Sequence, residues 1–322
     1  MTDNKINWQR GTILAVEPAA EHIAKIVIGT EEPHRVVPGS HVDIRIDTGS
    51  VRSYSVVSGA SDGRSITLGV HLSPTSRGGS HFMHTLVPGD DLAVTAPLQN
   101  FPLRIGAPRY VLLAGGIGIT AIAAMAAALR RIGADYRLHY VGRSRKGMAF
   151  LPDLVATHGN RLSLHVDDEG TGLDVSAVVA DVDQSAELYM CGPIRLMDAV
   201  RRAWIDRDLP LPNLRYETFG NSGWFEAQEF IVNIPRLGIE TTVAEGDSLL
   251  DALERAGVDM MFDCRKGECG LCQVDILDVR GSVDHRDVFF SELQKDACRK
   301  MCSCVSRVAK SDGPTVLTLD IP

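Results

Sequence analysis

The chain has 322 residues, of which 44% are hydrophobic and 23% charged, and its formal net charge is -8. A chain of this length usually exceeds one hydrophobic core, so we expect more than one domain. The acidic balance disfavours nucleic acid as a partner, because phosphate binding requires a basic face. The first residues, "MTDNKINWQR", contain no apolar signal segment, so we expect a cytoplasmic protein whose seven cysteines stay reduced.

Short strand-like segments separated by Gly, Pro and Asp occupy the first part of the chain, residues 1–104. Examples are "GTILAVEP", "IAKIVIG" and "SITLGVHL", and the one helix-like piece is "SHFMHTLV". Short strands at even spacing predict a small antiparallel β-barrel.

Strand-like and helix-like segments alternate in the middle of the chain, residues 105–225, beginning with "RYVLLAG" and "ITAIAAMAAALRRIG". This alternation predicts an α/β domain with a parallel sheet covered by helices. Residues 110–129 are long and apolar enough to suggest a membrane span, but glycines at 115, 116 and 118 divide them. We interpret this stretch as strand, tight turn and helix, and expect no membrane association.

The polar stretch "NSGWFEAQ" is predicted to be a linker to a third domain. The strand-like segments "EFIVNIP" and "GIETTVAEG" follow it. They precede "DSLLDALERAG", a predicted helix with Asp247 or Ser248 as N-cap and Gly257 beyond its end. We therefore predict three domains, at residues 1–104, 105–225 and 226–322.

Three cysteines lie within the loop "CRKGECGLC", residues 264–272. Cys264, Cys269 and Cys272 have the C-x4-C-x2-C spacing of plant-type ferredoxins, and Gly267 and Gly270 suit the crowded backbone of such a loop. A structural zinc site is the alternative, but zinc sites usually pair two C-x2-4-C knuckles. The loop therefore predicts a 2Fe-2S cluster, with a fourth ligand that spacing leaves open among Cys298, Cys302 and Cys304.

Two glycine-rich stretches suit anion binding. "SRGGS", residues 76–80, precedes the helix-like piece of the barrel, so backbone amides of Gly78, Gly79 and Ser80 can face an anion while Arg77 adds charge. "AGGIGIT", residues 114–120, forms a strand-to-helix turn typical of dinucleotide sites, and "YMCGP", residues 189–193, ends a later strand.

Together with "RSYS" (52–55), "YETFG" (216–220), "DHRDVFFSE" (284–292) and "CVSR" (304–307), these motifs resemble the phthalate dioxygenase reductase family. The likeness extends over essentially the whole chain. It implies a multi-domain fold: an antiparallel β-barrel flavin domain, an α/β parallel-sheet nicotinamide domain, and a C-terminal α+β plant-type ferredoxin (β-grasp) domain. It also implies the cofactors FMN, NADH and a 2Fe-2S cluster.

For the flavin, the resemblance implies a site built from "RSYS" and "RGGS". Arg52 would meet the phosphate, and Tyr54 and Ser55 would face the isoalloxazine. A guanidinium grips phosphate through two bonds, an aromatic ring covers a flat ring, and a hydroxyl bonds a ring edge. Ser53 belongs to the same motif and is included in the predicted site, as are Arg77, Gly78, Gly79 and Ser80. FMN is expected instead of FAD because the phosphate ends in this pocket.

For the nicotinamide, the resemblance implies a site between the two turns of the α/β domain. The family's proline after the threonine is Ala121 here, so the helix entry is expected to be less rigid. Glu217 and Phe219 of "YETFG" are implied to lie beside the isoalloxazine, with Phe219 giving way to nicotinamide; core packing is the alternative for Phe219. The residues implied by the two turns are Gly115, Gly116, Gly118, Thr120, Cys191, Gly192 and Pro193.

A second region, "GRSRKG" (142–147), bears on whether the nucleotide is NADH or NADPH. Arg143, Arg145 and Lys146 follow a strand end and could hold a 2'-phosphate, although a solvated charged loop is the alternative. The resemblance favours NADH, which we adopt.

The resemblance also resolves the fourth iron ligand. In the family, the cysteine before x-S-R is the ligand, which is Cys304 here, and Cys298 and Cys302 stay unassigned. The predicted iron ligands are Cys264, Cys269, Cys272 and Cys304.

The predicted activity is that of an NADH-dependent reductase that takes a hydride onto FMN and passes single electrons through the cluster to a separate Rieske-type terminal oxygenase. Flavin can hold two electrons, one or none, so it can divide the pair. No general acid, base or nucleophile is needed, so no catalytic side chain is nominated. The alternatives are a redox-sensing switch protein and a reductase for a hydroxylase without a Rieske centre.

Overall fold

The computed structural model describes residues 7–47, 49–74, 76, 78–219, 223–309 and 313–321. The chain divides into two units. The first unit comprises Met1–Gly192 with Ala199–Glu217, and the second comprises Pro193–Asp198 with Thr218–Pro322.

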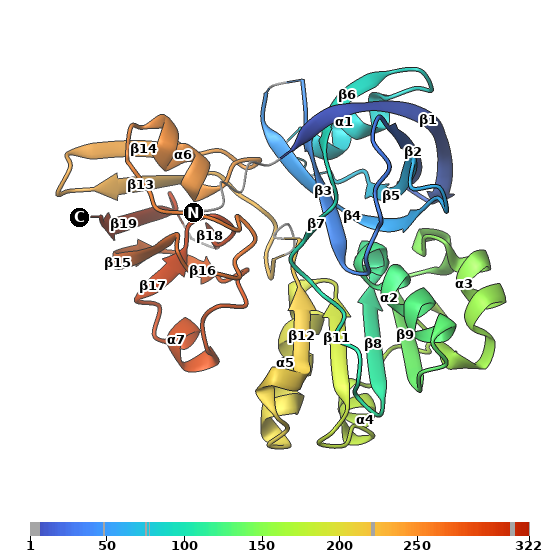
Figure 1. The fold of residues 1–322 in the computed structure, drawn as a ribbon. Helices are drawn as coiled ribbons and strands as arrows, with labels where there is room; N and C mark the ends of the chain where they lie inside the picture. Colours follow the sequence, from blue (N-terminus) through green and yellow to red (C-terminus); the bar gives the residue numbers. More distant parts are fainter. Residues whose placement is uncertain are drawn as a thin grey trace, which may run out of the picture. The chain divides into compact units, whose positions relative to one another are not determined.

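Antiparallel strands form a barrel in the first unit, in the order β4-β5-β2-β1-β6-β3-β7 (Figure 1). An additional pairing of β3 with β4 closes the barrel. The short helix α1 (Gly79–Thr85) lies between β5 and β6 in the sequence. The strands are β1 (Trp8–Ala20), β2 (Ile23–Thr30), β3 (Ser40–Arg45), β4 (Val51–Gly59), β5 (Ser65–His71), β6 (Asp91–Thr95) and β7 (Leu98–Gln99).

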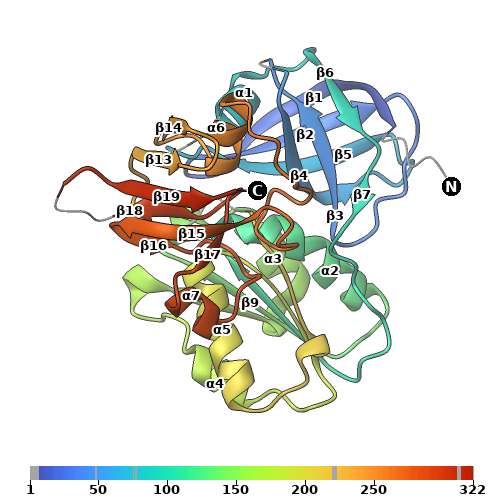
Figure 2. The same ribbon diagram turned by 90° about the vertical axis from the view of Figure 1, so that its left-hand side faces the viewer.

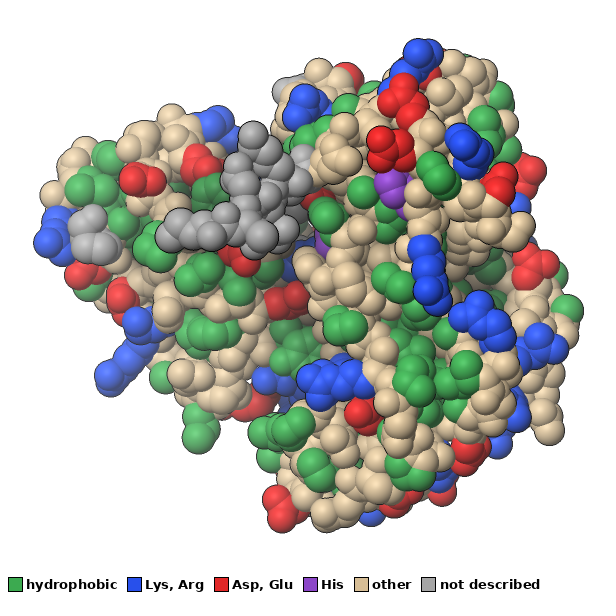
Figure 3. Space-filling view, in the orientation of Figure 1, with side chains coloured by type: hydrophobic (Ala, Val, Ile, Leu, Met, Phe, Trp, Pro, Cys, Tyr) green, Lys and Arg blue, Asp and Glu red, His purple; other side chains and the backbone are tan. Residues whose placement is uncertain are grey.

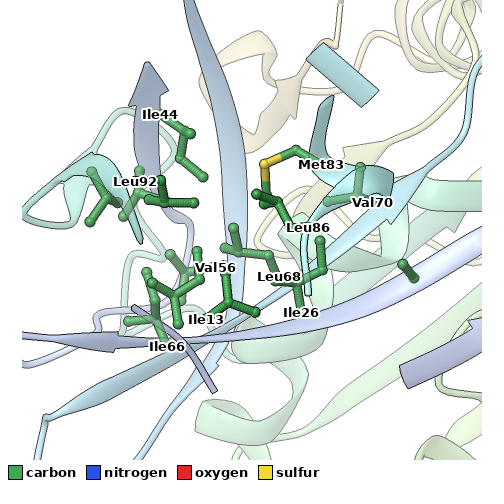
Figure 4. Close-up of a cluster of buried hydrophobic side chains, with 14 residues drawn as sticks. Ile13, Ile26, Ile44, Val56, Ile66, Leu68, Val70, Met83, Leu86 and Leu92 are labelled. Atoms are coloured by element: carbon green, nitrogen blue, oxygen red, sulfur yellow. The ribbon is translucent and has the colours of Figure 1, made fainter. Parts of the chain in front are cut away.

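Alternating side chains explain why these strands close around a core. In β2, Ile26 and Ile28 are fully buried while Lys25 points outward, as a period of two requires. Leu68 of β5 and Met83 of α1 are buried in the same cluster (Figure 4). Burying one such side chain stabilises the fold by about 1.5–3 kcal/mol. The predicted antiparallel barrel is confirmed.

A parallel sheet of strand order β10-β9-β8-β11-β12 forms the rest of the first unit. The chain moves outward from β8 to β10 and returns to the other side of β8, so the topological switch point lies between β8 and β11 (Figure 1; Figure 2 gives the view turned by 90°). Ligands of such sheets bind at this point, outside the carboxyl ends of the strands. The strands are β8 (Tyr110–Gly115), β9 (Tyr136–Gly142), β10 (Leu162–Val166), β11 (Glu187–Cys191) and β12 (Leu214–Glu217).

Helices connect the parallel strands, as the sequence predicts. They are α2 (Ile119–Arg131), α3 (Leu151–His158), α4 (Val175–Ala180) and α5 (Ile194–Asp206). The apolar stretch 110–129 forms strand β8, a 3-10 turn at Gly116–Gly118 and most of α2, which confirms its interpretation.

The second unit contains a five-stranded sheet of order β14-β13-β19-β15-β17 and a separate pair, β16 with β18. In it, β13 pairs with β19 in parallel, and the other pairings of this sheet are antiparallel. Its elements are β13 (Phe230–Ile234), β14 (Ile239–Val243), α6 (Leu249–Arg255), β15 (Gln273–Arg280), β16 (Ser282–Asp284), α7 (Glu292–Asp296), β17 (Lys300–Cys302), β18 (Arg307–Ala309) and β19 (Val316–Asp320).

Helix α6 begins as predicted, and the structure selects Ser248 from the two candidate N-caps. Its hydroxyl accepts a hydrogen bond from the backbone N–H of Asp251, whose carboxylate in turn accepts from the backbone N–H of Ser248. Gly257, beyond the helix end, has a φ of +80°, which favours glycine.

The predicted linker is bonded to the "DHRD" motif within the second unit. The backbone N–H of Trp224 donates to Asp284 Oδ1 at 2.9 Å, and Arg286 Nη2 donates to the carbonyl of Phe225 at 3.1 Å. Arg286 also bonds Asp284. The predicted fold class is confirmed, whereas the boundaries at 104/105 and 225/226 stay a prediction.

Charges of both signs are mixed on the surface. Figure 3 shows Lys and Arg side chains interspersed with Asp and Glu side chains on the face in view. Within the described residues, the structure contains no helix that combines the length and the apolar character needed to cross a membrane.

Candidate functional site

The two predicted flavin motifs meet in the barrel. A Cβ on Gly79, at the start of α1, would lie 2.8 Å from Cγ of Arg52 and 2.9 Å from the hydroxyl of Tyr54, both on β4. Only glycine permits this approach. Gly78, just before α1, has a φ of +87°, a backbone conformation that also favours glycine. The structure thus brings the aliphatic stem of Arg52 and the phenol of Tyr54 against the glycine turn, while Nη1 of Arg52 donates to the carbonyl of Val51 at 2.8 Å.

Strand alternation divides the "RSYS" motif between two faces of β4. Arg52 and Tyr54 share one face, and Tyr54 packs against the barrel core. Burial raises the pKa of the Tyr54 phenol, and the nearby charge of Arg52 only partly opposes this, so Tyr54 stays protonated at neutral pH. Ser53 lies on the other face, where its hydroxyl donates to Asp43 Oδ1 at 2.5 Å. Its predicted place in the flavin site stays untested.

The remaining predicted residues of the glycine turn are only partly described. Ser80 accepts a hydrogen bond through its hydroxyl from the backbone N–H of Ser73 at 3.2 Å. Arg77 lies outside the described residues.

Ser55, on the same face of β4 as Ser53, connects the barrel to the parallel sheet. Its hydroxyl donates to Glu217 Oε2 at the end of β12, at 3.2 Å, and both side chains are buried. A carboxylate so removed from water needs donors, and Ser55 supplies one. Glu217 therefore lies at the "RSYS" motif, and its predicted place beside the isoalloxazine stays a prediction.

The barrel also approaches the start of α2. A Cβ on Gly69 of β5 would lie 2.7 Å from Cγ2 of Thr120 and 3.0 Å from Cε2 of Phe150. Thr120 is buried, and its hydroxyl donates to the carbonyl of Ile117 at 2.9 Å, within the glycine-rich turn. Phe150 has a φ of +59° and was not expected at this place, since nothing in its sequence context indicates a left-handed residue.

The two predicted nicotinamide turns touch at the switch point of the sheet. A Cβ on Gly118 would lie 2.1 Å from the carbonyl oxygen of Cys191 and 2.9 Å from the backbone N of Gly192. Gly115 ends β8, and Gly116 has a φ of +54°. The glycines therefore let one turn rest on the backbone of the other.

Two further residues lie where these turns meet the neighbouring helices: Pro193 before α5, and Ala121 after the first turn. Pro193 accepts hydrogen bonds at its carbonyl from the backbone N–H groups of Leu196 and Met197, which form the first turn of α5. Ala121, where the family has proline, is buried in α2.

An ion pair joins the loops that follow β9 and β10, on the carboxyl side of the parallel sheet. Arg145 donates from Nε to Glu169 Oε1 at 2.6 Å and from Nη2 to Glu169 Oε2 at 2.9 Å. This bidentate bond lowers the pKa of Glu169. Glu169 follows Asp167 and Asp168, and the backbone N–H of Asp168 donates to the carbonyl of Arg143 at 3.0 Å, so this acidic segment lies beside the loop that contains Arg145. The guanidinium of Arg145 is therefore already engaged by an anion of the protein.

The glycines of the cysteine loop are required by its backbone. Gly267 and Gly270 have φ values of +75° and +73°. A Cβ on Gly267 would lie 3.0 Å from Cα of Asp287, and one on Gly270 would lie 2.3 Å from the ring of Phe289. The loop is thus folded tightly against residues 287–289, as the sequence predicts for a crowded loop.

Cysteine sulfurs and backbone amides face one another in this loop. The sulfur of Cys264 accepts from the backbone N–H groups of Lys266 and Glu268, each at 3.4 Å. The thiol of Cys304 contacts those of both Cys264 and Cys272. Iron-sulfur clusters are held by cysteine thiolates and tuned by hydrogen bonds to sulfur, so the residue types and the amide donors of this loop suit one.

The other late cysteines differ from Cys304. Cys302 contacts Cys272, and Cys298 is exposed with its thiol bonded to the carbonyl of Lys295. Across the residues that the structure describes, no group of three or more Cys, His, Asp or Glu side chains has the geometry of a metal site. The four-cysteine ligand set therefore stays a prediction, supported by pairwise contacts.

Comparison with known proteins is consistent across the chain. The model of the 2Fe-2S iron-sulfur cluster binding domain matches residues 232–309, which include the four cysteines predicted as ligands. The "Phenoxybenzoate dioxygenase subunit beta" of Ectopseudomonas oleovorans is 36% identical over 88% of this chain and 87% of its own length. The "Carnitine monooxygenase reductase subunit" of Escherichia coli (strain K12) is 32% identical over 91% of this chain and 93% of its own length. The solved structure of phthalate dioxygenase reductase is 29% identical with a TM-score of 0.73 and covers 98% of both chains.

The chain belongs to the phthalate dioxygenase reductase family. This reductase is an oxidoreductase with a C-terminal 2Fe-2S binding domain. The resemblance inferred from the motifs is thereby confirmed, together with the order of barrel, parallel sheet and ferredoxin fold.

One residue of the reductase escaped the sequence reasoning. Thr218, between Glu217 and Phe219, donates its backbone N–H to Glu268 Oε1 at 2.7 Å and its hydroxyl to the carbonyl of Lys266 at 2.5 Å. A threonine in a coil segment carries no signal of such a contact. Phe219 is half-buried, and its predicted place beside a flavin stays a prediction.

The close approach of Gly118 to Cys191 generates a stability prediction. Gly118→Ala places a methyl group against a backbone carbonyl that cannot yield as a flexible side chain would, so the two turns must separate. We expect the free energy of unfolding to fall by about 1–3 kcal/mol, measured by urea denaturation.

The matched control is Gly147→Ala, because Gly147 follows β9 in the same sheet and an added Cβ there meets only the side-chain oxygen of Ser144, at 3.9 Å. We expect a change within about 0.5 kcal/mol for this variant. Equal losses in the two variants would show that the close approach does not matter.

Proposed function

We propose that this reductase oxidises NADH, divides the electron pair at a bound FMN, and delivers electrons singly through a 2Fe-2S cluster to a separate Rieske-type oxygenase component. The observation that carries the proposal is the convergence, within one unit, of the two flavin motifs at Gly79 and of the two nucleotide turns at Gly118. Bound FMN supplies a centre that accepts two electrons and releases them one at a time.

The flavin site is proposed from the residues around Gly79. Arg52 offers a guanidinium for a phosphate, and Tyr54 offers a protonated hydroxyl and an aromatic face. Gly78 and Gly79 lie at the start of α1, where backbone amides can face an anion. Ser55 and Glu217 form a buried polar pair that can hold a proton-bearing ring edge. FMN in place of FAD follows from the family resemblance.

The nucleotide site is proposed at the switch point, where Gly118 meets Cys191 and Gly192. The pairing of Arg145 with Glu169 supports NADH in place of NADPH. A 2'-phosphate dianion would have to displace Glu169 from Arg145 while meeting the charges of Asp167 and Asp168. A ribose hydroxyl, by contrast, can donate to such carboxylates.

The iron ligands are proposed to be Cys264, Cys269, Cys272 and Cys304. Cys304 is favoured over Cys302 because its thiol contacts two of the loop cysteines, whereas the thiol of Cys302 contacts one. We also propose that the three functions divide at the predicted boundaries, with flavin at residues 1–104, nucleotide at 105–225 and cluster at 226–322.

A protein acceptor is supported by the surface of the cluster loop. Leu271, between two proposed ligands, is 47% exposed, and Phe289 and Met261 are exposed apolar side chains of the second unit. The names of several relatives place them in dioxygenase and monooxygenase systems. A separate oxygenase component is therefore the acceptor that we propose.

The first prediction concerns the fourth iron ligand. Cys304→Ser removes one of four thiolates, so we expect loss of most of the cluster's visible absorbance and of electron transfer to cytochrome c. Anaerobic NADH should still bleach the flavin, because no residue of the flavin or nucleotide site is changed. The measurement is an absorbance spectrum followed by a cytochrome c reduction assay.

The control for that variant is Cys302→Ser, which should keep the cluster. If the Cys304→Ser variant retains its cluster and the Cys302→Ser variant loses it, the fourth ligand is Cys302 and the assignment is wrong.

The second prediction concerns the choice of nucleotide. Glu169→Ala frees the Arg145 guanidinium to form a bidentate, charge-assisted hydrogen bond with a 2'-phosphate. We expect kcat/KM for NADPH to rise at least about tenfold, while that for NADH changes little. Steady-state assays with both nucleotides give the ratio.

The matched control is the double variant Arg145→Ala/Glu169→Ala, which lacks both charges of the pair. The gain for NADPH should disappear in it. If kcat/KM for NADPH rises in the double variant as well, or does not rise in Glu169→Ala, the ion pair does not determine the choice between NADH and NADPH.

A further inference from the structure

Thr218 makes an unusual set of contacts within the second unit. It is 3% exposed, and it bonds two of the four residues between Cys264 and Cys269 in the cysteine loop, Lys266 and Glu268. Its hydroxyl is 2.5 Å from the carbonyl oxygen of Lys266 and 3.0 Å from Glu268 Oε1, and its backbone N–H donates to Glu268 Oε1 at 2.7 Å. One side chain and one amide therefore hold the loop at two points.

The same two loop residues are the amide donors to the ligand sulfur. The backbone N–H groups of Lys266 and Glu268 both point to Cys264 Sγ, at 3.4 Å. Hydrogen bonds to cluster sulfurs stabilise the more negative, reduced state and raise the reduction potential. The positions of Lys266 and Glu268 therefore decide how strongly the protein favours a reduced cluster.

We propose that Thr218 is a positioning residue for the iron-sulfur loop, and that its hydroxyl sets the reduction potential of the cluster by fixing the amides of Lys266 and Glu268 toward Cys264. This role rests on the proposed function, since it takes Cys264 as an iron ligand. It assigns a purpose to a threonine that none of the family motifs explains.

Packing alone does not account for the residue. A buried valine fills the same volume as threonine, but it leaves the carbonyl of Lys266 without the hydroxyl that it accepts from. The contact is polar on both sides, and the hydroxyl is the only part of Thr218 that reaches Lys266 in a hydrogen bond. Comparison of valine with serine at this position therefore separates the hydroxyl from the shape.

The experiment is an EPR-monitored redox titration of the full-length holoprotein with Thr218→Val and Thr218→Ser. Neither substitution changes a charge, so a shift reports the hydrogen bonds. We expect the equilibrium constant for one-electron reduction of the cluster to fall about tenfold in Thr218→Val, which is 59 mV for a one-electron couple. Thr218→Ser, which retains the hydroxyl, should stay within about twofold of the wild type.

A loaded Thr218→Val protein with the wild-type potential overturns the role and leaves the proposed ligand set intact. If Thr218→Val loses the cluster and Thr218→Ser retains it, the role is supported, because the hydroxyl is then needed for the loop to hold iron. Equal loss from both variants overturns it. A wild-type protein without any cluster overturns the proposed function as well.

A second pair of variants tests the other end of the contact. Glu268→Ala removes the acceptor of the Thr218 amide together with one negative charge beside Cys269. Asp263→Ala removes one negative charge beside Cys264 and is exposed, so it measures the charge effect. We expect the potential of Glu268→Ala to lie below that of Asp263→Ala. Equal potentials would contradict the role of the contact.

Discussion

The close approach of barrel and parallel sheet in the first unit is the constraint on which the proposed redox site depends. Gly69 admits Thr120 and Phe150 to the barrel surface, and a buried hydrogen bond joins Ser55 to Glu217. A Cβ on Gly69 would press on the side chains of Thr120 and Phe150, so either they or the barrel surface would have to shift. Hydride transfer needs donor and acceptor in contact, so this packing, more than any single polar group, makes the proposed chemistry possible.

The division of labour in the chain follows from electron counting. A nicotinamide gives up two electrons as hydride, whereas a 2Fe-2S cluster accepts one, so the proposed flavin would divide the pair between them. The protein's contribution is then to bind, orient and tune. In the proposed function the pairing of Arg145 with Glu169 selects the nucleotide, while Thr218 bonds the loop whose amides donate to Cys264.

Features that depend on local sequence were predictable, and features that depend on distant contacts were not. The C-x4-C-x2-C loop, the glycine turns and the helix start at Asp247 or Ser248 follow from short-range backbone requirements, whereas the strand places Ser53 and Tyr54, predicted together, on opposite faces. The Arg145–Glu169 pair and the Thr218 contacts join segments of different elements, and Phe150 adopts a left-handed φ that only its packing explains. No local pattern reports such pairings.

The most direct test of the central claim is an anaerobic stopped-flow reaction of the purified wild-type protein with NADH, recorded across the visible spectrum, with the flavin identified after heat release. The account predicts loss of flavin absorbance followed by loss of cluster absorbance, each at one equivalent of cofactor per chain, and FMN in the released fraction. Reduction of the cluster in a protein that contains no flavin, or a flavin that NADH cannot reduce, would contradict it.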